Sequence, residues 1–118
     1  MQVHAVSFGS YNSILKTAWK KGQLPTVTKG IYGNILTNDN LSLEHVIPHS
    51  LGGATRLDNL MLAEKTANAK RGIKPLMEVI SYEQLFDYLK QFIDIKIKKF
   101  NGNEYIIKVL KTIGRTTK

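Results

Sequence analysis

The sequence contains no cysteine among its 118 residues. This absence excludes a disulfide framework, a cysteine-bound zinc ion, an iron–sulfur cluster and a thiol nucleophile. Long hydrophobic runs are also missing, and none approaches the roughly 20 apolar residues that a membrane-spanning helix requires. The first ten residues lack the charged segment and apolar run that are typical of a signal peptide. We therefore expect a cytoplasmic protein without a membrane partner.

What is present is a composition typical of globular proteins, with 42% hydrophobic and 22% charged residues. This amount of apolar surface can form one modest core and argues against a disordered chain. The length suits one domain, and we find no internal repeat, low-complexity linker or domain boundary.

Positive charge is in excess and unevenly distributed. The formal net charge is +8, and residues 90–118 contain eight Lys or Arg against only Asp94 and Glu104. A basic segment of this kind is what binding to a phosphate backbone requires. A solubilising surface would explain the same charge, so composition alone leaves both interpretations open.

The N-terminal half shows one helical pattern followed by extended chain. Apolar residues at helical spacing predict a helix over residues 10–21. Over residues 26–47, residues that favour strands alternate with glycine and asparagine, which predicts extended chain and turns, with a strand that ends at Pro48. Residues 49–57 are expected to form a loop, in which Gly52 and Gly53 are free to adopt positive φ.

The C-terminal half is expected to be mainly helical. A helix is predicted over residues 58–71, with Asp58 as its N-cap and Gly72 just after its end. Ser81 and Gln84 form a capping box for a third helix, and residues 106–113 are predicted to be a short helix or a strand. The third helix is expected to bury Leu85, Phe86, Leu89, Phe92 and Ile93.

Four polar residues carry the candidate chemistry. Glu44 and His45 are adjacent, and since neighbouring strand residues point to opposite faces, they can serve one site only if the strand bends there. Asn59 and Asn68 are nine positions apart on the predicted helix, which would place them on opposite sides and give them different tasks. Glu44 and Asn68 offer hard oxygen ligands that suit Mg²⁺ or Mn²⁺. Each feature alone could be an ordinary surface pair or a helix cap.

Their order and spacing are more informative. The string EHVIPHSLGG, followed by DNL and then by NAKRG, resembles the motif of the HNH nuclease family. The resemblance covers about residues 30–75 and implies an α+β fold with a ββα-metal (HNH) core, flanked here by N- and C-terminal helices. The third motif position is often histidine but is Asn68 here, so the chain resembles the H-N-N subtype, also seen in CRISPR effector nucleases. We expect one HNH nuclease domain over residues 1–118, with a basic helical extension over about 81–118.

The resemblance also implies a role for each matching residue. Glu44, which stands where aspartate is common, and Asn68 would bind one divalent cation, Mg²⁺ or Mn²⁺. His45 would be the general base, and Asn59 would hold the backbone of the segment that carries it, so that His45, Asn59 and Asn68 form the predicted catalytic set. Many relatives carry a zinc-binding cysteine cluster that this chain lacks, so we expect packing of the flanking helices to hold the core.

These roles imply metal-assisted hydrolysis of DNA phosphodiester bonds, in which neutral His45 takes a proton from water. The predicted nucleic-acid contacts are Lys70, Arg71 and His49, although a plain loop role is the simpler interpretation of His49. One such site cuts one strand, so a monomer would nick, and a double-strand break would require a homodimer or two events. DNA is the expected partner, and no protein partner is implied.

Several biological settings and two other classes stay open. The small size favours a phage or mobile-element nuclease of homing type, with a phage packaging or restriction-type HNH nuclease as alternatives. A non-catalytic basic nucleic-acid-binding protein, or a ribosomal type of RNA-binding protein, would fit the charge. Neither gives a reason for the order of Glu44, His45, Asn59 and Asn68, because a protein that only binds has no use for a general base.

Overall fold

The computed structural model describes residues 14–116, in which helices and short strands are mixed, as expected for an α+β chain. The described residues begin with a helix at 14–20, which lies within the predicted span of 10–21; residues 10–13 of that prediction lie outside the described residues. The remaining elements are β1 (Leu41–His45), β2 (Leu60–Glu64), α2 (Lys65–Arg71), α3 (Leu76–Val79), α4 (Tyr82–Leu89), β3 (Lys96–Ile97), β4 (Phe100–Asn101) and α5 (Gly102–Thr116).

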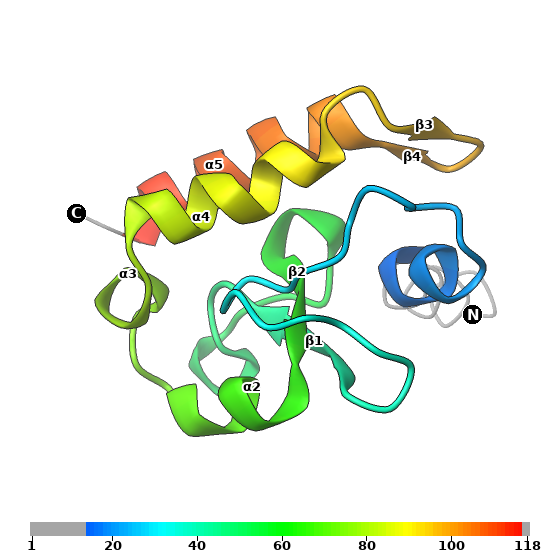
Figure 1. Cartoon of the computed structure of the whole chain (residues 1–118). Coiled ribbons are helices and arrows are strands. Elements are labelled where there is room, and N and C mark those ends of the chain that lie inside the picture. Colours follow the sequence, from blue (N-terminus) through cyan, green and yellow to red (C-terminus); the bar gives the residue numbers. More distant parts are fainter. Residues whose placement is uncertain (1–13, 117–118) are drawn as a thin grey trace, which may run out of the picture.

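Two antiparallel strands, β1 and β2, lead into the helix α2, which lies at the lower edge of the molecule in Figure 1. In the register of β1 and β2, Leu41 pairs with Glu64 and His45 pairs with Leu60. The Glu64 side chain accepts hydrogen bonds of 3.0 Å from the backbone N–H groups of Thr66 and Ala67, which caps α2 directly at the end of β2. The result is a continuous strand–strand–helix unit over residues 41–71.

The predicted helix over residues 58–71 is wrong in its first half. Residues Leu57–Asn59 form a single 3₁₀ turn, Leu60–Glu64 is the strand β2, and only Lys65–Arg71 is α-helical. A short continuous apolar run fits a strand buried on both faces as well as a buried helix, and residues 60–63 are all fully buried. Asn59 and Asn68 therefore do not share a helix, and the expectation that they lie on its opposite sides no longer applies.

The helices α4 and α5 are attached to the outer edge of β2 by two tyrosines. The Leu62 N–H donates to the Tyr88 hydroxyl (2.8 Å), and the Tyr105 hydroxyl donates to the Leu60 carbonyl (2.7 Å). The two hydroxyl oxygens are 3.0 Å apart, so Tyr88 donates to Tyr105. Since both tyrosines are fully buried, this chain of hydrogen bonds satisfies backbone groups that an edge strand would otherwise leave unpaired.

The C-terminal helices lie where the sequence predicts them, but some residues that are predicted to be buried are exposed. The capping box of Ser81 and Gln84 is present at the start of α4, and residues 106–113 lie within the helix α5. The predicted stripe on α4 is wrong at Phe86 and Ile93, which are 52% and 56% exposed, while Tyr88 is buried in their place. Within residues 14–116, none of the helices has the length and hydropathy needed to cross a bilayer.

Candidate functional site

Glu44 and His45 lie at the carboxyl end of β1, where the strand leads into the loop over residues 46–59. Glu44 is buried and 7% exposed, whereas His45 is half-buried. Burial of a carboxylate next to a strand end is costly unless the group is paired, so its partners identify the electrostatic centre of the site.

Asn59 ties the end of this loop back to its beginning and middle. Its Oδ1 accepts a 2.8 Å hydrogen bond from the Ile47 N–H, and its Nδ2 donates to the carbonyls of Ile47 (3.1 Å) and Ala54 (2.9 Å). The side chain is 4% exposed, so these bonds are shielded from water. A buried amide thus fixes the backbone two residues after His45, which is the segment that sets the direction of the imidazole.

Gly53 allows the same loop to close on itself. A Cβ atom added at Gly53 would lie 1.8 Å from the Ile47 carbonyl oxygen and 2.9 Å from the Asn59 amide nitrogen. The reason for this glycine is therefore close backbone approach, while the neighbouring Gly52 has the positive φ of 92° that the turn requires.

The substitution Gly53→Ala is expected to lower the free energy of unfolding by about 1–3 kcal/mol, because the loop must move away from Ile47 to admit the methyl group. Gly114→Ala is the matched control, since a Cβ there meets no atom within 4 Å and alanine favours the helix. Urea denaturation measures both changes. Equal stability of Gly53→Ala and the wild type would show that the loop is not held against Ile47.

Arg71 and Tyr32 surround the Glu44 carboxylate. The Tyr32 hydroxyl donates to Glu44 Oε2, and Arg71 Nη1 lies 3.4 Å from Glu44 Oε1. The same guanidinium donates to the backbone carbonyls of His45 (2.5 Å), Val46 (2.7 Å) and Lys74 (2.7 Å). Burial raises the pKa of Glu44, and the hydrogen bond from Tyr32 and the charge of Arg71 oppose that rise.

His45 lies beside Thr55 and His49. Its Nε2 is 3.2 Å from the Thr55 hydroxyl, and its ring centroid is 5.9 Å from that of His49. Burial lowers the pKa of His45, and the nearby charges of His49 and Arg71 lower it further. The imidazole is consequently uncharged near pH 7, the state in which a histidine can accept a proton.

Asn68 projects from α2 onto the same strand. Its Nδ2 donates to the Ser42 hydroxyl and to the Leu43 carbonyl, both at 3.0 Å. Because Ser42 and Glu44 are two residues apart in β1, they share one face of the strand, and this is the face against which Asn68 and Arg71 pack. The Asn68 Oδ1 accepts no hydrogen bond from any residue within 14–116.

The oxygen donors on this face are few. Among the described residues, no three His, Asp or Glu side chains gather closely enough to hold a metal ion. A magnesium site commonly takes one or two carboxylates from the protein and fills its remaining positions with water and substrate phosphates. The Glu44 carboxylate and the Asn68 Oδ1, which accepts no hydrogen bond within the described residues, are ligands of the kind that such a site takes from the protein. Arg71 already occupies one side of the carboxylate, so a cation would compete with the guanidinium there.

The predicted phosphate contacts differ in exposure. His49 and Lys70 are exposed, as a contact with nucleic acid requires. Arg71 is 2% exposed, and its guanidinium is fully used in bonds to Glu44 and to backbone carbonyls. The Arg71 guanidinium is therefore buried and not presented to solvent, and its contact with a phosphate stays a prediction.

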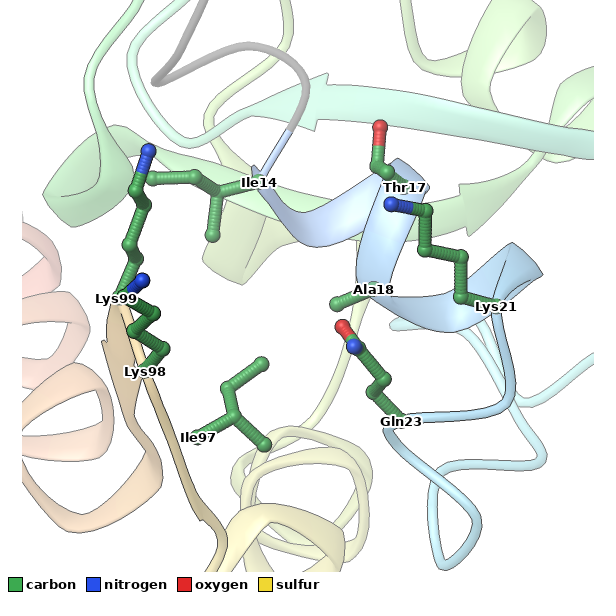
Figure 2. A pocket seen from close by; sticks show the side chains of 8 residues that line it. All are labelled: Ile14, Thr17, Ala18, Lys21, Gln23, Ile97, Lys98 and Lys99. Carbon is green, nitrogen blue, oxygen red and sulfur yellow. The ribbon is translucent and has the colours of Figure 1, made fainter.

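Two cavities of similar volume are lined by other parts of the described chain. One, of about 350 Å³, separates the segment around Thr28 from α4. The other, of about 340 Å³, lies between the helix at 14–20 and the hairpin of β3 and β4. Figure 2 shows Lys98 and Lys99 on the hairpin and Lys21 across the cavity from them. Neither cavity contains any of the predicted site residues.

Sequence reasoning missed three participants in the site. Tyr32 and Thr55 carry no local signal, because each meets its partner only after the chain folds. The structural role of Arg71 was also missed, although its position three residues after Asn68 places both side chains on one side of α2. Comparisons with known protein families, with curated proteins and with solved structures find no match to this chain.

Proposed function

We propose that this protein is a divalent-metal-dependent DNA endonuclease of the HNH type that hydrolyses phosphodiester bonds with His45 as the general base. The observation that supports the proposal is that four residues of the motif lie on one strand–strand–helix unit, residues 41–71. Glu44 and His45 end β1, Asn59 clamps the loop behind them, and α2 brings Asn68 against the same strand. Their order along the chain is that of the HNH motif.

In the proposed mechanism, each residue has a separate task. The neutral imidazole of His45 takes a proton from the attacking water, while Asn59 keeps the backbone that carries the ring in place. Glu44 and Asn68 would hold Mg²⁺ or Mn²⁺, and the bound cation would supply positive charge for the phosphate oxygens. Arg71 orients the strand end through the carbonyls of His45 and Val46.

A non-catalytic DNA-binding protein is the second candidate, and one observation favours it. The only carboxylate at the end of β1 is already engaged by Tyr32 and Arg71, as it would be in a purely structural network. We prefer the nuclease because the order of Glu44, His45, Asn59 and Asn68 along the chain is that of the HNH motif, which a protein that only binds DNA does not require. Within that class, a phage or mobile-element enzyme of homing type and a restriction-type enzyme are the settings we propose.

Incubation with supercoiled plasmid separates the two candidates. The nuclease is expected to convert the plasmid to nicked circles with Mg²⁺ or Mn²⁺ and to leave it intact with EDTA. A monomer would give nicked circles first, and early linear product would indicate paired sites. Binding without any metal-dependent cleavage, in protein shown to be folded, would refute the nuclease and favour the binding protein.

The cleavage rate is expected to fall toward acid pH with a midpoint below 6.5. Because burial lowers the pKa of His45 below 6.5, the ring stays neutral at pH 7 and becomes protonated, and so inactive as a base, only at lower pH. Single-turnover rates between about pH 5 and 8 at saturating Mn²⁺ measure the profile. A flat profile, or a midpoint well above 7, would contradict the assignment of His45.

A further inference from the structure

A basic groove runs between the loop that follows β1 and the helix α5. Its volume is about 290 Å³, and it is lined by Arg56, Leu57, Asp58, Lys108, Lys111 and Arg115. Four of these side chains are cationic and one is a carboxylate, and all four cationic residues are exposed. The groove therefore offers an excess of accessible positive charge along one surface.

The cationic wall on α5 is a regular stripe. Lys108, Lys111 and Arg115 follow the spacing i, i+3, i+7, which places them on one side of a helix. The opposite side of α5 is buried through residues such as Val109 and Ile113. At 1.5 Å per residue the stripe extends over roughly 10 Å, which is about the rise of three nucleotides of one DNA strand.

Both walls of the groove are fixed to the strand ends that carry His45. On one wall, Arg56 directly follows Thr55, whose hydroxyl is 3.2 Å from His45 Nε2. On the other wall, Tyr105 of α5 bonds to the carbonyl of Leu60, and Leu60 is the register partner of His45. None of its lining residues is a predicted site residue, but these two links connect the groove to the strand pair of the candidate site; among the described residues, no such link is seen for the lysine-lined cavity in Figure 2.

The positive charges of the groove are incompletely neutralised. Arg56 lies 3.7 Å from Asp58, and Lys108 lies 3.3 Å from Glu104, but exposed pairs of this kind are weak. Lys111 has no ion pair with any residue of the described chain, and Arg115 bonds only to the Thr112 hydroxyl (3.2 Å). These two side chains are therefore available to an anionic partner.

We propose that this basic groove binds the phosphate backbone of duplex DNA and leads it to the His45 site. The proposal deepens the proposed function and rests on it for the position of the cleaved bond, but binding itself can be measured without cleavage. A regular row of cations matches the regular spacing of backbone phosphates, and contacts of this kind position DNA without reading its sequence.

The double variant Lys111→Gln/Arg115→Gln tests the groove. Fluorescence anisotropy with a labelled 30-base-pair duplex in EDTA is expected to show affinity reduced by about tenfold or more at moderate salt. The slope of log K against log salt concentration should become shallower by about one for each phosphate that the protein no longer neutralises. Circular dichroism should be unchanged, because both side chains are exposed.

Lys21→Gln/Lys98→Gln is the matched control, since it removes the same charge from exposed residues of the cavity in Figure 2, which shares no lining residue with the groove. It should keep nearly wild-type affinity and slope. Equal losses in the two variants, no loss in the groove variant, no duplex binding by the wild type, or equal competition by polyglutamate would each overturn the proposal. Groove-dependent binding without metal-dependent cleavage would instead refute the proposed nuclease function, while the proposal that the groove binds duplex DNA would be supported.

Discussion

Replacing His45 by alanine is expected to lower the rate of metal-dependent plasmid cleavage by about 10²–10⁴-fold, the contribution typical of a positioned general base. The imidazole is half-buried at the end of β1 beside the Thr55 hydroxyl, and burial lowers its pKa so that it can accept a proton at neutral pH. Single-turnover cleavage of supercoiled plasmid with Mn²⁺ measures the loss. Metal and duplex binding should remain, because neither task is assigned to this side chain.

The control for this prediction is His49→Ala. His49 is exposed on the neighbouring 3₁₀ turn, and its ring is 5.9 Å from that of His45. We expect His49→Ala to retain most of the cleavage rate and both variants to remain folded, since the His45 side chain contributes one hydrogen bond worth about 1 kcal/mol. Loss of activity in His49→Ala, with wild-type activity in His45→Ala, would transfer the role of base to His49.

The local signals in the sequence are reliable where one short motif determines the structure. The capping box at Ser81 starts α4, and the strand expected before Pro48 is β1. The segment after Asp58 is predicted as helix but folds as a strand, because an apolar run of four residues does not reveal whether it is covered on one face or two. Only the fold shows that Tyr88 and Tyr105 cover the outer edge of β2 and make it a buried strand.

The candidate site likewise combines residues that the sequence indicates with contacts that only the fold shows. The sequence singles out Glu44, His45, Asn59 and Asn68; in the structure Glu44 and His45 end β1, Asn59 holds the loop that follows, and Asn68 bonds to Leu43 of β1. The sequence does not indicate that the carboxylate is paired with Arg71, because that contact joins residues 27 positions apart and depends on how α2 packs on β1. Long-range polar contacts have no local pattern from which they could be read.

Arg71 links more parts of the site than the four motif residues, Glu44, His45, Asn59 and Asn68. Its guanidinium lies beside the Glu44 carboxylate and donates to the carbonyls of His45, the last residue of β1, and Val46, the residue after it. It also donates to the carbonyl of Lys74, beyond the end of α2. The side chain is almost completely buried, so its removal leaves the buried Glu44 carboxylate without the cation beside it. Loss of one partner from a buried ion pair leaves the other partner's charge uncompensated.

Arg71→Met is therefore expected to lower the free energy of unfolding by about 3–5 kcal/mol, a large share of the 5–15 kcal/mol typical of a domain. Lys70→Met is the matched control on the same helix; Lys70 is exposed, so its loss should change stability by less than about 0.5 kcal/mol. Urea denaturation at pH 7 measures both. If the pair with Glu44 causes the loss, the double variant Glu44→Gln/Arg71→Met should be more stable than the sum of the single effects predicts. Strict additivity, or a loss below about 1 kcal/mol in Arg71→Met, would mean that the guanidinium does not hold this site together.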